Sequence, residues 1–300
     1  LRKGPPGRFE STLRGKAGES RDEEVVRGSE YPERVATDYV RRAIGQLILQ
    51  RVGSVIALPA ERKTLVLLYK ILMHRHRWKS LGLPLANFAR LLLDAEPTTD
   101  SGESLSSFRK LLPLFERILK GRLSYQGELG STTLAYAHEG APSLRLHAAA
   151  SLVRALAGLG VYLDRLAERG DLLIVDEPEM NAHPEAQLMI TELLGVLVNS
   201  GINVVLTTHS PYVLEHVSNL AAAARLPESK KDEVASRFKL GTKEAFVPGE
   251  NVSAYLFDEH GRVQDIFDRA EGDIDCSTFG SASDHVDNLF GDVLEAARRE

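Results

Sequence analysis

The chain has 300 residues, of which 43% are hydrophobic and 26% charged, an ordinary balance for a globular protein of one large or two smaller domains. Its net charge of −5 argues against a general nucleic-acid-binding protein, and no apolar run approaches the ~18 residues that a membrane-spanning helix needs. The one cysteine, Cys276, forms no internal disulfide, which fits a reducing setting. We therefore expect a cytoplasmic protein with no membrane partner.

The N-terminal part of the chain predicts a loop followed by a helix. Residues 1–30 are rich in Gly, Arg, Lys and Glu with little periodicity, which is typical of a loop. Residues 34–51 predict a helix, because Val35, Tyr39, Ala43 and Leu47 are spaced by four and would lie on one helix face. A short strand is predicted from Val55 to Leu58, and it leads into the sequence Pro-Ala-Glu-Arg at 59–62.

Residues 62–121 predict helices with polar breaks, and we expect them to form a helical insertion. One helix is predicted over 65–81 and another over 104–120. The first ends in the basic stretch HRHRWK at 74–79, which allows two interpretations. It contacts a partner or the phosphate backbone of a nucleic acid, or it is a solvated helix end whose cations favour the helix dipole. DNA is therefore a candidate partner through this local patch.

A small antiparallel sheet and a helix are predicted next. Three short alternating segments, at 122–125, 133–136 and 144–146, have turn residues between them. The helix is predicted over 147–170, with an apolar stripe at Leu152, Leu156, Leu159 and Leu163. This helix leads into the stretch that carries the chemistry.

Two adjacent carboxylates end a predicted buried strand. The apolar run from Leu172 to Val175 is followed directly by Asp176 and Glu177. Burying two acids costs several kcal/mol per charge unless a cation or a partner compensates. Ligands of open α/β sheets bind at the carboxyl ends of the strands, so the pair is a candidate cation and ligand site. The alternative is an acidic turn that favours the dipole of the following helix.

A second strand brings a histidine toward these acids. A loop at 181–184 precedes a helix that is predicted to run from Pro184 to about Ser200, and residues 203–208 predict another apolar strand that ends in His209. A strand–helix–strand unit of this length makes the two strands parallel. We therefore expect His209 and Glu177 at the same edge of one sheet.

The segments DEPEMNAHPEAQ (176–187) and TTHSPYVL (207–214) carry a family resemblance. Together they resemble the ABC-type AAA ATPases related to the overcoming-lysogenization-defect (OLD) nucleases, as found in bacterial phage-defence systems, and more distantly the SMC-like repair ATPases. The resemblance implies an α/β fold, that of a P-loop NTPase of the ABC ATPase type with a parallel sheet flanked by helices. It also implies one such domain over residues 1–300, with the insertion at about 62–121 and ATP and Mg²⁺ as cofactors.

The same resemblance implies roles for named residues. Asp176 would be the Walker B aspartate that holds Mg²⁺ through water, and Glu177 the catalytic glutamate. His209 would be the switch histidine that senses the γ-phosphate. Asn181 and His183 would stand with Ala182 in a D-loop that touches the partner subunit and its nucleotide.

Ser151 is similar to the serine of the ABC signature motif. The resemblance implies that this serine and its helix N-terminus bind the γ-phosphate on the opposite subunit, as helix N-termini bind anions. The usual Gly-Gly is absent from this place, and the alternative is a serine that caps its own helix. The signature role implies a homodimer or a higher even oligomer around ATP.

The chain departs from the family at the phosphate cradle. The Walker A pattern G-x-x-x-x-G-K-[ST] occurs nowhere in residues 1–300, and the pair Gly15-Lys16 is followed by Ala17. The family carries this pattern before Walker B, and the sequence starts at Leu1 rather than at Met, so we expect the Walker A segment upstream of Leu1. The Q-loop residue stays unassigned.

The C-terminal part predicts no effector domain. We expect a helix over 211–226, a charged loop with a short helix over 227–250, a hairpin over 252–267 and an amphipathic helix over 284–300. Asp273 and Asp275 lack the strand pattern of a nuclease metal site, and we interpret them as an acidic surface loop. The resemblance then implies control of a separate effector, such as a nuclease in anti-phage defence.

Three functional hypotheses follow from the sequence. The first is an ATP-hydrolysing ATPase that dimerises around ATP and Mg²⁺. The second is a non-hydrolysing scaffold or sensor with a degenerate ATPase fold, which the missing Walker A favours and the intact Asp-Glu pair opposes. The third is an SMC-like DNA-repair ATPase, which needs long heptad arms that residues 63–121 do not supply.

Overall fold

The computed structural model describes residues 2–3, 9–10, 52–74, 82–97, 106–127, 132–258, 260–277, 288–290 and 293. The chain separates into two compact units, Leu1–Val52 and Gly53–Glu300. In the first unit, β1 (Arg2–Lys3) pairs antiparallel with β2 (Phe9–Glu10). The helix predicted over 34–51 and the basic stretch beyond His74 lie outside the described residues.

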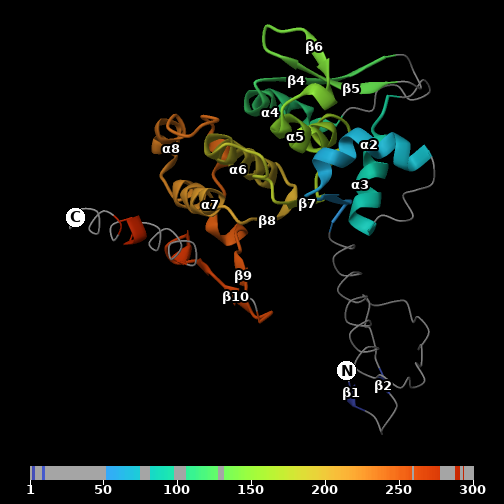
Figure 1. Cartoon of the computed structure of the whole chain (residues 1–300). Coiled ribbons are helices and arrows are strands. Elements are labelled where there is room, and N and C mark those ends of the chain that lie inside the picture. The colour runs from blue at the N-terminus through green and yellow to red at the C-terminus, as the bar shows by residue number, and fades with distance from the viewer. Residues whose placement is uncertain are drawn as a thin grey trace, which may run out of the picture. The chain divides into compact units, whose positions relative to one another are not determined.

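A three-stranded parallel sheet forms the centre of the second unit (Figure 1). Its strand order is β3 (Val55–Leu58), β7 (Leu172–Asp176) and β8 (Asn203–Thr207). These strands lie in the same apolar runs from which the sequence predicts them. In the register of β7 and β8, Asp176 stands opposite Thr207, so the two strands end side by side. The predicted parallel pair is confirmed.

The two faces of this sheet differ in burial. One face presents apolar side chains to the main hydrophobic core; Leu58, Leu173 and Val175 are buried there, and Val204 and Leu206 of β8 are half-buried. On the other face, Val55 is 47% exposed and Val205 is 50% exposed. Parallel sheets are usually covered on both faces. The helices described in this unit therefore bury one side of the sheet much more completely than the other.

Three helices lie around the sheet, α5 (Ser151–Val161), α6 (Pro184–Asn199) and α7 (Pro211–Ala224). Two of them, α6 and α7, have nearly the predicted bounds. Proline occupies the first position of α6 and of α7, where its missing N–H costs nothing. The helix predicted over 147–170 is shorter than expected. Residues Leu146–Ala148 form a separate 3₁₀ turn before it, and Tyr162–Leu166 form a π-helical turn at its end.

The expected insertion contains α2 (Arg62–His74), α3 (Leu83–Asp94), a 3₁₀ turn (Ser107–Leu111) and α4 (Leu112–Leu119). Its helices pack on α5, where two glycines leave room for aromatic rings. A Cβ atom on Gly158 would stand 2.6 Å from the ring of Phe88, and one on Gly160 would stand 2.7 Å from Phe115. The division into one ATPase domain with an insertion stays a prediction.

The predicted antiparallel sheet is confirmed in β4 (Gly121–Gln126), β5 (Thr133–His138) and β6 (Ser143–Arg145). The predicted hairpin is confirmed in β9 (Tyr255–Phe257) and β10 (Val263–Asp265). The other C-terminal elements are α8 (Glu228–Ala235), 3₁₀ turns at Lys243–Ala245 and Gly249–Asn251, β11 (Phe267–Asp268) and β12 (Asp273–Ile274). Most of the helix predicted over 284–300 lies outside the described residues.

The element composition confirms the predicted α/β fold. A parallel sheet flanked by helices stands beside a small antiparallel sheet, as in a P-loop NTPase. Within the part of the chain that the structure describes, no helix is both long enough and apolar enough to cross a membrane.

A buried acid anchors the start of β7. Asp171 is 1% exposed, and its carboxylate accepts hydrogen bonds from the Ser54 amide (3.0 Å), the Tyr162 hydroxyl (2.9 Å) and the Glu168 amide (2.9 Å). Burial raises the pKa of Tyr162, and the hydrogen bond to Asp171 raises it further. These bonds join the strand to β3 and to the end of the helix before it.

We expect Asp171→Ala to lower the free energy of unfolding by about 3 kcal/mol, because it leaves three donors without their acceptor. Urea unfolding followed by circular dichroism measures this loss. The matched control is Asp232→Ala on exposed α8, which we expect to change stability by about 0.5 kcal/mol. Equal unfolding midpoints for the two variants would contradict the anchoring role.

Candidate functional site

The two predicted acids stand where β7 ends, and the end of β8 holds them. The Thr207 hydroxyl donates to Asp176 Oδ1. The Glu177 amide donates to the carbonyl oxygen of Thr207 (3.1 Å) and to the Thr207 hydroxyl (3.2 Å). Both acids are partly exposed. The strand pairing therefore presents two carboxyl groups at the accessible carboxyl edge of the sheet.

Glu177 has an unusual main-chain conformation. Its φ is +46°, in the left-handed region. For a residue with a Cβ this conformation costs about 1–2 kcal/mol, and it persists only where the surroundings determine it. The strain therefore falls on the residue that the sequence predicts as the catalytic glutamate.

Arg62, at the start of α2, contacts the main chain of the two acids and is 1% exposed. Its guanidinium donates to the main-chain oxygens of Glu177 (2.7 Å), Ala155 (2.9 Å) and Pro59 (3.0 Å), and also to that of Asp176. Burial lowers its pKa, while the carboxylates of Asp176, Glu179 and Glu177 oppose that change. The sequence analysis assigned Arg62 no role, although it stands directly after a strand end in the Pro-Ala-Glu-Arg sequence.

Glu179 connects the loop after β7 to the histidine after β8. Its Oε1 accepts hydrogen bonds from the Thr208 hydroxyl (2.7 Å) and the His209 amide (3.0 Å). Its Oε2 is buried and has no hydrogen-bond partner among the described residues. His209 is an exposed residue. The predicted neighbourhood of His209 and the acids is thus built through Glu179, which sequence analysis did not single out.

We expect Glu179→Ala to release the His209 loop, because both of its hydrogen bonds to this loop end on one carboxylate oxygen. Amide hydrogen exchange of residues 207–211 should become faster, and stability should fall by about 1–3 kcal/mol. Glu233→Ala on α8 is the matched surface control. Unchanged exchange in this loop would show that Glu179 does not hold it.

Gln187 supplies a second connection between the same two loops. Its Nε2 donates to the Ala182 carbonyl (3.0 Å), and its Oε1 accepts from the Ser210 hydroxyl (2.5 Å). Ser210 is buried, and its amide donates to the Thr208 hydroxyl (3.0 Å). Hydrogen bonds through Gln187 therefore connect the predicted D-loop to the loop that carries His209.

The two predicted D-loop residues have contacts within the chain. His183 is the N-cap of α6, and its Nδ1 accepts a hydrogen bond from the Glu185 amide at 3.4 Å. Asn181 is exposed with a φ of +63°, and its Oδ1 accepts from Lys63 Nζ at 3.2 Å. The role of both residues toward a partner subunit stays a prediction.

Ser151 begins α5 but does not cap it. The N-cap residue is Ala150, whose side chain makes no capping hydrogen bond, so the alternative interpretation of Ser151 as N-cap is wrong. The Ser151 hydroxyl accepts a hydrogen bond from Arg154 Nη2 (3.1 Å). The first amides of α5 therefore have no side-chain cap, and such amides are suited to an anion.

The oxygen donors at the sheet edge suit Mg²⁺ held together with a nucleotide. Mg²⁺ usually binds through one or two carboxylates, waters and phosphate oxygens rather than in a protein cage. Asp176 supplies one carboxylate, and Thr207 fixes its orientation. Among the described residues, no group of three or more His, Cys, Asp and Glu side chains could hold a metal ion by itself. The edge therefore fits the phosphate-dependent kind of Mg²⁺ site.

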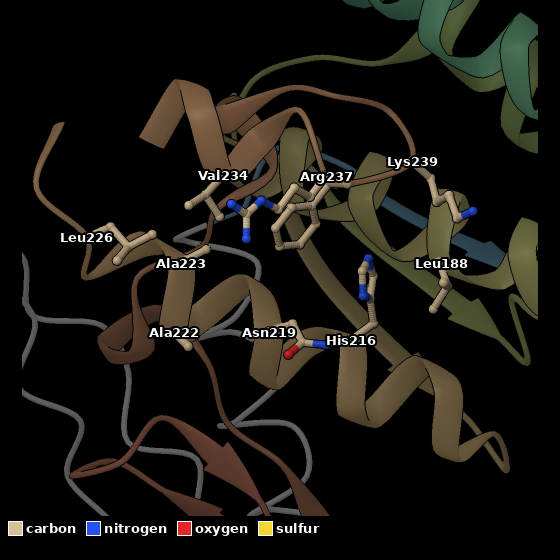
Figure 2. A pocket seen from close by; sticks show the side chains of 10 residues that line it. Leu188, His216, Asn219, Ala222, Ala223, Leu226, Val234, Arg237 and Lys239 are labelled. Carbon is tan, nitrogen blue, oxygen red and sulfur yellow. The ribbon is translucent and has the colours of Figure 1, made fainter. Parts of the chain in front are cut away.

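A separate pocket of about 460 Å³ lies between α6, α7 and the region of α8 (Figure 2). In Figure 2, Val234 and Arg237 face His216 and Asn219 of α7 across the hollow. None of the residues predicted for the ATPase site lines it; the lining is Leu188, His216, Asn219, Ala222, Ala223, Leu226, Val234, Arg237, Phe238 and Lys239.

A buried pair lies beside this pocket. His216 Nε2 is 2.9 Å from Oε1 of Glu192, which is 0% exposed and also accepts from the amides of Lys239 (2.9 Å) and Leu240 (2.6 Å). These bonds fasten the chain after α8 to α6. The pair thus has a structural explanation and needs no ligand.

Comparison with known families agrees with the geometry. Residues 102–214 match the family model described as an AAA ATPase domain. The match includes Ser151, Asp176, Glu177 and His209. No curated protein matches the chain. The match supports an AAA-type ATPase domain that binds and hydrolyses ATP.

Proposed function

We propose that this protein is an ABC-type ATPase related to the OLD family, which hydrolyses ATP to ADP and phosphate at the carboxyl edge of the β3–β7–β8 sheet. The observation that carries the proposal is the gathering of Asp176, Glu177 and His209 at this edge, joined by Thr207 and Glu179. The match of residues 102–214 to an AAA ATPase domain supports the same reaction class.

Each residue has a separate part in the proposed reaction. Asp176 would hold Mg²⁺, and the ion would supply positive charge beside the phosphate oxygens. Glu177 accepts the proton of the attacking water or orients that water toward the γ-phosphorus. His209 donates a hydrogen bond to the γ-phosphate and stabilises the charge that develops there. Residues 1–300 contain no Walker A pattern, so this proposal assigns none of them to the phosphate cradle.

A pair of subunits completes the proposed site. Ser151 and the uncapped amides of α5 in one subunit contact the γ-phosphate held by the other. Asn181 and His183 lie on the same subunit surface in this proposal. The assembly is therefore a homodimer or a higher even oligomer, and hydrolysis opens it.

The proposed biological role is the control of a separate effector, such as a nuclease acting in anti-phage defence. An SMC-like repair role is less well supported, because α2 and α3 span only 13 and 12 residues and provide no coiled-coil arms. DNA remains a candidate partner through the basic stretch at 74–79.

The test is phosphate release from ATP by the purified protein beside its Glu177→Gln variant, with nucleotide binding measured separately. Turnover in the wild type and its loss in the variant, with binding retained, support the ATPase. Binding without turnover in the wild type would favour the non-hydrolysing scaffold or sensor. Turnover that persists after EDTA would contradict the part of Asp176 and Mg²⁺.

A further inference from the structure

One buried guanidinium joins three elements of the candidate site. Arg62 belongs to the first turn of α2, and it contacts the middle of α5 through Ala155 and the end of β7 through Asp176 and Glu177. These partners are 93 to 115 residues away along the chain. The contact is therefore a tertiary connection between elements that lie far apart in the sequence.

All the hydrogen-bond acceptors of Arg62 are main-chain oxygens. Among the described residues, none of its bonds goes to a carboxylate, so the carboxyl groups of Asp176 and Glu177 stay available at the sheet edge. A buried cation is costly unless its donors are satisfied and opposite charge lies close. The planar fork of arginine meets several acceptors at once, in directions that a lysine ammonium does not reproduce.

Arg62 contacts Glu177, the residue whose main chain is left-handed. Arg62 Nη2 holds the Glu177 carbonyl at 2.7 Å, and Thr207 holds the amide of the same residue at 3.1 Å. Both peptide groups that flank the Glu177 Cα atom are thus held, and the φ at this atom is +46°. The Met180 amide also donates to the Glu177 carbonyl oxygen, at 3.1 Å. Without Arg62, this bond alone would hold the carbonyl side, and relaxation toward a negative φ would turn the Glu177 side chain.

We propose that Arg62 is a positioning residue for hydrolysis, which fixes the main chain of Asp176 and Glu177 so that the Glu177 carboxylate is directed at the attacking water. The inference rests on the proposed ATPase function. Because Arg62 also holds Ala155 of α5, the helix that begins with Ser151 is connected to the same peptide. A shift of α5 on subunit pairing is then transmitted to Glu177.

The test compares Arg62→Lys and Arg62→Gln with the wild type in two measurements. We expect kcat for ATP to fall about 100-fold while KM is unchanged, since a displacement of about 1 Å costs that much in rate. Amide hydrogen exchange of residues 176–182, measured without nucleotide, should become faster in both variants. Thermal unfolding by circular dichroism verifies the fold.

Arg225→Lys is the matched control. Arg225 also donates to main-chain oxygens, those of Arg269 (2.9 Å), Ala270 (2.8 Å) and Glu271 (2.8 Å), and it lies in the C-terminal part of the unit. Arg225 is exposed, so its replacement removes several bonds to main-chain oxygens at the surface, away from the acids. We expect unchanged kcat and unchanged exchange at residues 176–182.

Several outcomes would overturn the proposal. A wild-type kcat in either folded Arg62 variant, or unchanged exchange at 176–182, would remove the positioning role and leave the ATPase function intact. If both variants lose cooperative unfolding while Arg225→Lys keeps it, Arg62 is structural and the proposal fails. If the wild type itself has no turnover, the proposed function fails, and the exchange data alone report whether Arg62 holds this peptide.

Discussion

Glu177→Gln is expected to lower kcat for ATP about 1,000-fold, within the range that a positioned proton acceptor contributes. Glutamine has the size and shape of glutamate, but its amide does not accept the proton of the attacking water. Nucleotide binding should persist, because Glu177 acts on the water and not on the phosphate chain. The variant should therefore bind ATP and hold it unhydrolysed.

The structure makes this substitution a specific one. Arg62 and Thr207 hold Glu177 through its carbonyl oxygen and its amide, and neither bond involves the side chain. The left-handed main chain should remain in the variant. A loss of turnover would then report the chemistry of the carboxylate and not a rearranged loop.

Phosphate release and equilibrium ATP binding measure the two quantities separately. The matched control is Glu233→Gln, an exposed residue of α8 that pairs with Arg237 at 3.3 Å, and its kcat should equal that of the wild type. Equal turnover of wild type and Glu177→Gln would remove Glu177 from the mechanism. Loss of both binding and turnover would assign it to nucleotide binding instead.

The sheet and the two loops of the candidate site were predictable because their signals are local. An apolar run that ends in Asp176 and Glu177, one helix and a second run that ends in His209 specify parallel neighbours. The chirality of the crossover and the pairing of strand ends then bring the polar residues together. The structure confirms this arrangement in the register of β7 and β8.

The connections that hold the site were less predictable. The bonds from Arg62 to Ala155 and Glu177 cross 93 and 115 residues, and no local pattern specifies such contacts. The positive φ of Glu177 was equally hidden, because glutamate has no preference for the left-handed region. Glu179 stands in the conspicuous acidic motif, yet its bond to the His209 amide depends on how the second loop folds.

Helix ends were the weakest part of the sequence analysis. The helix before β7 was predicted to begin at residue 147, but Leu146–Ala148 form a separate turn and Ala150 is the N-cap. An alanine at this place gives no capping signal, whereas Ser151 gives a misleading one. The consequence matters for function, since the true cap leaves the amides near Ser151 without a side-chain partner.

Asp176→Asn is expected to abolish the stimulation of ATP turnover by Mg²⁺, with kcat lowered about 1,000-fold. Asparagine keeps an oxygen that accepts from the Thr207 hydroxyl, so the strand ends should stay paired. What the variant loses is the negative charge that would hold the ion beside the phosphates in the proposed mechanism. ATP binding measured in EDTA should therefore be little changed, whereas its enhancement by Mg²⁺ should disappear.

A titration of Mg²⁺ at fixed ATP, read by phosphate release and by nucleotide binding, separates this effect from that of Glu177→Gln. The glutamine variant should keep the Mg²⁺ dependence of binding and lose only turnover, and Asp232→Asn on exposed α8 should match the wild type in both. A normal Mg²⁺ dependence in Asp176→Asn would place the ion on other residues. Because the proposed mechanism assigns Asp176 to the ion and Glu177 to the water, two distinct defects are the expected result.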